Sequence, residues 1–100
     1  MITPDELFNC CTNGTAPDWS VYAELVLEGC RDVSRNPEAG TEISGGYDRH
    51  EAEFFAVYAI GHEGYADAIT DVHGTMDAAE DILHHLSGLS GLPARRHELL

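Results

Sequence analysis

The stretch from Phe54 to Leu86 constrains the fold most, because it joins an apolar run to an amphipathic one. Residues 54–60 read FFAVYAI and are rich in aromatic and β-branched residues, which favours a β-strand. Gly61 and Gly64 follow, and residues 65–72 then fit a returning strand. The pattern predicts an antiparallel β-hairpin over 54–72.

Helical spacing is the alternative for this stretch, since apolar residues of 65–76 also recur at intervals of three and four. Asp48 and Glu51 could cap a helix running through Phe55. The two glycines would interrupt such a helix at about 1 kcal/mol each, whereas a hairpin turn uses them. The hairpin is therefore the preferred interpretation.

Residues 75–87 form the clearest predicted helix. Thr75 is a good N-cap, acidic residues occupy the early turns where the helix dipole favours them, and Gly88 supplies a stop. The apolar stripe at helical spacing comprises Met76, Ala79, Ile82, Leu83 and Leu86. Because an isolated helix of this length is marginal in water, we expect the stripe to pack against the hairpin.

The N-terminal part is predicted to be helical. Thr3, Pro4 and Glu6 have the order of an N-cap, a first-turn proline and a capping-box acid, which predicts a short helix through about Cys11. Residues 18–35 fit both a strand alternation and a helical period. Their length without a turn signal favours a helix.

One hundred residues correspond to a single domain. Its predicted parts are a helical part (1–36), a connector (37–47), a hairpin–helix unit (48–88) and a flexible tail (89–100). The predicted fold class is α+β, with N-terminal helices followed by an antiparallel β-hairpin packed against a C-terminal amphipathic helix. Trp19 is expected to be partly buried. The predicted core comprises Phe8, Leu25, Phe55, Val57, Ile69, Ile82, Leu83 and Leu86.

The charge is strongly negative: eighteen Asp and Glu accompany five Arg and no Lys, for a formal net charge of -13. Such a surface repels nucleic acid and anionic membranes and attracts basic protein surfaces. We therefore predict binding to an Arg/Lys-rich surface of a partner protein. The candidate partner-binding residues are Glu63, Asp67, Asp71, Asp77, Glu80 and Asp81.

Motifs for catalysis or metal binding are weak. The three cysteines, two of them adjacent, do not form a disulfide framework, and residues 1–20 lack signal-peptide features, so a cytoplasmic setting is expected. The six histidines lack spacings such as CxxC or HExxH, and no phosphate-binding loop, dinucleotide fingerprint or GxSxG is present. We predict a protein that is not an enzyme and has no cofactor, metal site or catalytic residue; a metal- or small-ligand-binding domain using histidines is the alternative.

In its size, acidity and the pattern FFAVYAIGHEGYADAITDVHGTMDAAEDILHHL, the chain resembles small proteins of phages and mobile elements, among them anti-CRISPR inhibitors and other acidic DNA mimics. The resemblance is one of type, so no functional residue is carried over from it. It implies an inhibitor that blocks a basic nucleic-acid-binding surface of a host protein, for example a CRISPR–Cas protein, in the host cytoplasm. A haloadapted domain of other function is a further alternative, and the size is compatible with a homodimer.

Overall fold

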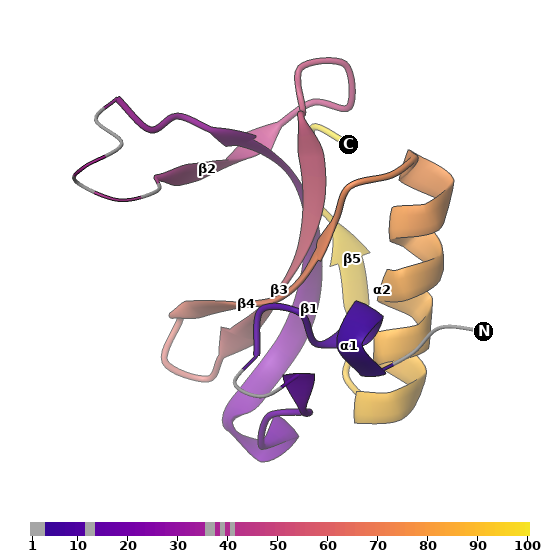
Figure 1. Ribbon diagram of the computed structural model, residues 1–100. Coiled ribbons are helices and arrows are strands. Elements are labelled where there is room, and N and C mark those ends of the chain that lie inside the picture. The colour runs from indigo at the N-terminus through magenta and orange to yellow at the C-terminus, as the bar shows by residue number, and fades with distance from the viewer. Residues whose placement is uncertain (1–3, 12–13, 36–37, 39, 41) are drawn as a thin grey trace.

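A five-stranded, mostly antiparallel sheet carries one long helix on one face (Figure 1). The computed structural model describes residues 4–11, 14–35, 38, 40 and 42–100. In chain order the elements are α1 (Pro4–Leu7), the 3-10 turn η2 (Trp19–Val21), β1 (Tyr22–Asp32), β2 (Ile43–Tyr47), β3 (Phe54–Gly61), β4 (Ala66–Val72), α2 (Met76–Ser90) and β5 (Ala94–Arg96).

Strand β1 is the centre of the sheet, whose order is β2-β1-β3-β4. One edge of β1 pairs with β3 from Tyr22 to Cys30. The other edge is shared: β5 pairs in parallel with Leu25–Leu27, and β2 pairs antiparallel with Gly29–Asp32. Strand β1 is eleven residues long, and three strands pair with it along this length.

The helix predicted over 18–35 is wrong, and with it the predicted fold class of N-terminal helices before a hairpin. These residues form η2 and then β1. Leu25 and Leu27 face the main core, whereas Val26 and Cys30 are buried on the other side of the strand, so burial does not alternate along it. A central strand that is buried on both faces loses the clean alternation that would distinguish it from a helix.

The predicted hairpin and C-terminal helix are present as elements. Strands β3 and β4 pair from Phe55 opposite Val72 to Ile60 opposite Ala66. The Thr75 side chain accepts a hydrogen bond from the Ala78 N–H at 3.1 Å, as expected of an N-cap. Helix α2 runs past the predicted stop and ends where Gly91 adopts a left-handed φ of 74°.

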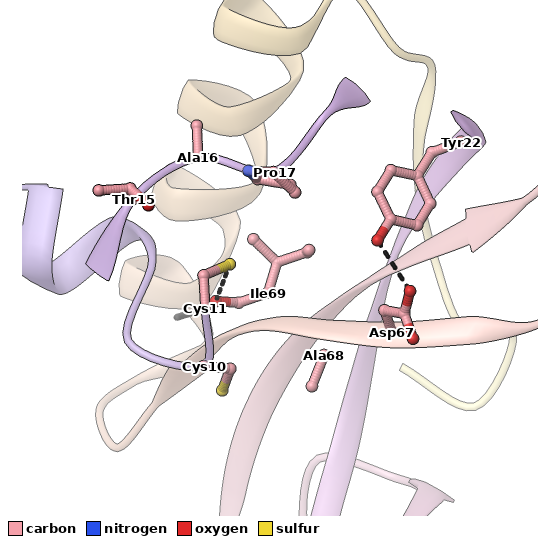
Figure 2. Close-up of a pocket in the computed structure, with 9 residues that line it drawn as sticks. All are labelled: Cys10, Cys11, Thr15, Ala16, Pro17, Tyr22, Asp67, Ala68 and Ile69. Atoms are coloured by element: carbon pink, nitrogen blue, oxygen red, sulfur yellow. Dashed lines mark hydrogen bonds between the residues drawn. The ribbon is translucent and has the colours of Figure 1, made fainter. Parts of the chain in front are cut away.

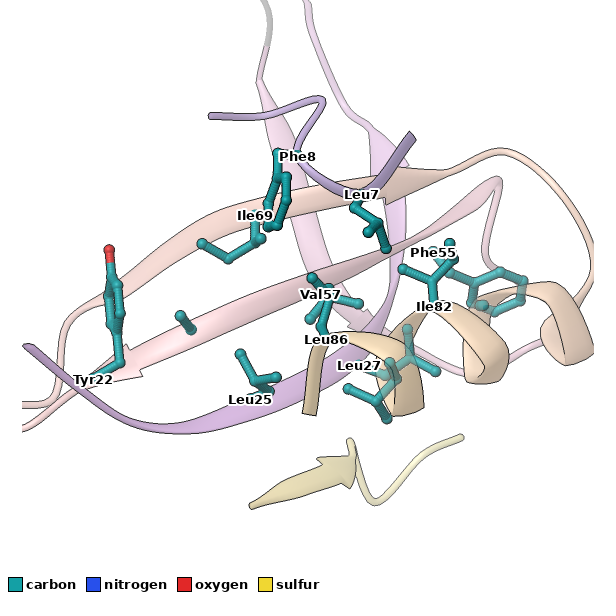
Figure 3. Packing of buried hydrophobic residues seen from close by; sticks show 13 residues of the cluster. Leu7, Phe8, Tyr22, Leu25, Leu27, Phe55, Val57, Ile69, Ile82 and Leu86 are labelled. Carbon is teal, nitrogen blue, oxygen red and sulfur yellow. The ribbon is translucent and has the colours of Figure 1, made fainter. Parts of the chain in front are cut away.

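The core lies between the sheet and α2, and the predicted core residues are all buried in it (Figure 3). Trp19 is partly buried against this cluster, as predicted. The cluster comprises Leu7, Phe8, Tyr22, Leu25, Leu27, Phe55, Val57, Ala59, Ile69, Ala79, Ile82, Leu83 and Leu86.

Two terminal predictions need correction. The predicted flexible tail contains β5, which ion pairs join to the body of the protein: Arg95 contacts Glu24 at 3.0 Å and Arg96 contacts Glu80 at 2.8 Å. The helix predicted through about residue 11 ends at Leu7, and the predicted cap at residue 3 lies outside the described residues. The predicted connector contains the five-residue strand β2.

In the described part of the chain, no helix has the length and apolarity needed to cross a membrane.

Candidate partner-binding surface

The N-terminal segment runs along the outer edge of β4. The two acidic residues of β4 line separate hollows beside this segment: Asp67 lines one and Asp71 lines the other. The Asn9 side chain donates to the Asp71 carbonyl at 2.8 Å and accepts from the Asp71 N–H at 2.7 Å. The Cys10 N–H donates to the Ile69 carbonyl at 3.2 Å, and the Thr70 hydroxyl donates to the Leu7 carbonyl. These bonds satisfy the edge of β4 as a neighbouring strand would.

The first hollow, here called the Asp67 hollow, has a volume of about 490 Å³ (Figure 2). The Tyr22 hydroxyl donates to Asp67 Oδ2 at 2.8 Å and holds this carboxylate in place. Burial, with the hydrogen bond to Asp67, raises the pKa of Tyr22 to about 12, so the hydroxyl remains a donor at neutral pH. Cys10, Cys11, Thr15, Ala16, Pro17, Tyr22, Asp67, Ala68 and Ile69 line it.

The second hollow, the acidic groove, has a volume of about 370 Å³ and lies between α1, the end of β4 and α2. It brings together two of the predicted acids, Asp71 and Asp81, and adds Glu6. Apolar atoms of Val72 and Ile82 lie among these carboxylates. Glu6, Asn9, Asp71, Val72, His73, Gly74, Ala78, Asp81 and Ile82 line it.

The remaining predicted acids are placed differently. Asp77 is exposed one helical turn before Asp81, on the same side of α2, and does not line the groove. Glu63 is exposed between β3 and β4 and lines a different hollow, together with His62 and Tyr65. Glu80 pairs with Arg96 at 2.8 Å. The six acids therefore do not form one cluster. The charge of Glu80 is already compensated by Arg96 of the same chain.

Within the described ranges, Glu80 alone among the six predicted acids forms a salt bridge. The other ion pairs in this part of the chain join Arg31 to Glu53 and Arg95 to Glu24. The other five predicted acids thus form no salt bridge with a residue of this part of the chain.

Among the polar residues of the two hollows, Asn9 and Tyr22 were not predicted as site residues, and Glu6 was predicted only as a helix-capping acid. No local pattern identifies them, because each acts on a segment far along the chain; Tyr22 and Asp67 are 45 residues apart. Only the pairing of β1 with β3 and of β3 with β4 brings that pair together.

The thiols of the Asp67 hollow are poorly suited to nucleophilic chemistry. Burial, followed by the charge of Asp71, raises the pKa of Cys10 to about 12, and burial raises the pKa of Cys11. Both groups are therefore neutral thiols at pH 7, whereas the thiolate is the reactive form. Figure 2 shows their sulfur atoms on opposite sides of the backbone. No three His, Cys, Asp or Glu side chains of the described residues gather as metal ligands.

No family model, no curated protein and no solved structure matches the chain.

Proposed function

We propose that the protein is a non-enzymatic acidic binding protein that blocks a basic, nucleic-acid-binding surface of a host protein, in the manner of a phage-type inhibitor. A CRISPR–Cas protein is an example of such a target, and the host cytoplasm is the compartment. One observation supports this proposal most strongly: the acidic groove combines Asp71 and Asp81, which form no salt bridge within the described chain, with apolar atoms of Val72 and Ile82.

This combination suits protein recognition for two reasons. Carboxylates without cationic neighbours speed the encounter with a basic surface by electrostatic steering. Apolar atoms between them provide contact area from which water is excluded in the complex. A net charge of -13 keeps the same surface from binding nucleic acid directly.

The test is capture of partners from a bacterial lysate by the tagged full-length protein at low and then moderate salt, with identification by mass spectrometry. We expect a basic nucleic-acid-binding protein that salt releases, because screening weakens exposed charge–charge contacts. An empty capture by the folded protein contradicts the proposal.

A pair of charge-matched variants then locates the surface. The double substitution Asp77→Arg and Asp81→Arg should weaken binding of the captured protein by about tenfold or more. The double substitution Glu51→Arg and Glu98→Arg makes the same change of net charge at exposed residues outside both hollows and should weaken it much less. Equal losses would show that net charge, and not this surface, determines binding.

A further inference from the structure

Tyr22, Tyr65 and Asp67 lie together where the β3–β4 hairpin projects away from α2 (Figure 1). Tyr22 on β1 pairs with Gly61 on β3, and the Gly61 N–H donates to the Tyr65 carbonyl at 2.8 Å. Tyr65 contacts Tyr22 through its ring, and Asp67 contacts Tyr22 through its carboxylate. Strand β1, strand β4 and the residue just before β4 therefore bring two aromatic rings and one carboxylate together.

Gly61 fixes the position of the Tyr65 ring. A Cβ atom on residue 61 would lie 2.4, 2.5 and 2.8 Å from three atoms of that ring, so the ring lies directly against the backbone of β3. The ring also meets Tyr22 edge-on, with centroids 6.3 Å apart and planes at 63°. The ring is held from two sides, yet the residue Tyr65 is still 44% exposed and lines a separate hollow with His62 and Glu63.

The carboxylate of Asp67 can accept further hydrogen bonds beside the one from Tyr22. Tyr22 donates to Oδ2, no described residue forms a salt bridge with the carboxylate, and the side chain is exposed. Ala16 and Pro17 supply apolar surface to the hollow beside it (Figure 2). A group that fits must carry a planar cation that both donates hydrogen bonds to a carboxylate and stacks on an aromatic ring, at the end of an apolar stem. The arginine side chain meets all of these requirements.

We propose that Asp67 and the exposed Tyr65 ring, which both contact Tyr22, together bind one arginine side chain of the partner, with its guanidinium group donating to Asp67 and lying against the Tyr65 ring. The inference rests on the proposed function, since it names the residue that the basic partner inserts. A lysine ammonium can approach Asp67 but lacks the flat surface that stacks on Tyr65. The site therefore selects arginine over lysine, which a diffuse acidic surface does not.

The experiment uses the full chain and three short peptides in which serine alternates with arginine, lysine or citrulline. At low salt, we expect the arginine peptide to bind about tenfold more tightly than the lysine peptide, with the neutral citrulline peptide weakest. Asp67→Asn and Tyr65→Ala should each abolish the preference for arginine. Asp81→Asn, on α2, is the matched control and should weaken both charged peptides while keeping their ratio.

The peptide measurements distinguish failure of the arginine site from failure of the proposed function. Equal binding of the arginine and lysine peptides to the unmodified protein overturns the arginine site and leaves the proposed function standing. Absence of binding by either charged peptide at low salt contradicts the proposed function itself. A measurement on the unmodified protein guards against misfolded variants: the arginine peptide should shift the ring resonances of Tyr22 and Tyr65, and shifts confined to other residues would overturn the site.

Discussion

At the scale of single residues, Asn9 shows how one side chain can take the place of a neighbouring strand. Its amide pairs with both the N–H and the carbonyl of Asp71 at the edge of β4. Asn9→Ala removes both bonds, so we expect the free energy of unfolding to fall by about 1–2 kcal/mol. Urea denaturation monitored by circular dichroism measures the change.

Asn9→Asp is the control for this substitution, because it keeps an acceptor for the Asp71 N–H and loses the donor to the Asp71 carbonyl. Its loss of stability should be at least as large as that of the alanine variant, because an acceptor-only carboxylate oxygen would face the Asp71 carbonyl in place of the donating N–H. An alanine variant as stable as the unmodified protein would mean that water replaces both hydrogen bonds at no cost.

At the scale of elements, the contact of α2 with the sheet depends on its buried stripe. Leu83 is 3% exposed and belongs to the core cluster, whereas Leu89 on the same helix is 55% exposed. Leu83→Ala should lower the free energy of unfolding by about 2–5 kcal/mol, because it leaves a cavity. Leu89→Ala removes the same atoms from a surface position and should change it by about 0.5 kcal/mol or less. Denaturant unfolding of both variants tests the contrast, and similar losses would contradict the packing of α2 on the sheet.

Elements with strong local signals could be predicted from the sequence, and those defined by distant pairing could not. The hairpin has an apolar run and two glycines, and α2 has a cap, a stripe and a C-terminal glycine. The prediction of a helix at β1 is wrong because the strand, buried on both faces, also fits a helical period, and the length of the run without a turn signal favours the helix. Strand β5 is only three residues long and exists through its parallel pairing with β1, far back in the chain.

The candidate site follows the same division. The acidic residues can be read from the sequence, and so can their excess over arginine. The grouping of these acidic residues cannot be predicted from the sequence. It depends on which edge of β4 the N-terminal segment occupies and on which turn of α2 faces that segment. As a result, the predicted set joins acids that the fold separates, such as Glu63 and Asp81, and omits Tyr22, which orients Asp67.

At the scale of the whole molecule, eighteen acids against five arginines make the folded state repel itself. Added salt should therefore raise the melting temperature, most steeply up to about 0.15 M, where the screening length falls to about 8 Å. The three ion pairs found among the described residues oppose this trend only slightly, because all of them are at the surface. Thermal unfolding over a series of KCl concentrations measures the effect.

Two further measurements distinguish like-charge repulsion from haloadaptation as the cause of this salt dependence. Asp77→Asn with Asp81→Asn removes a like-charge pair one helical turn apart and should flatten the dependence while raising the melting temperature at low salt. A haloadapted domain would behave differently, since it would reach its folded state only at molar salt. Cooperative unfolding from a folded state at low salt is expected, and its absence would mean that the acidity serves folding in brine and not the binding of a basic partner.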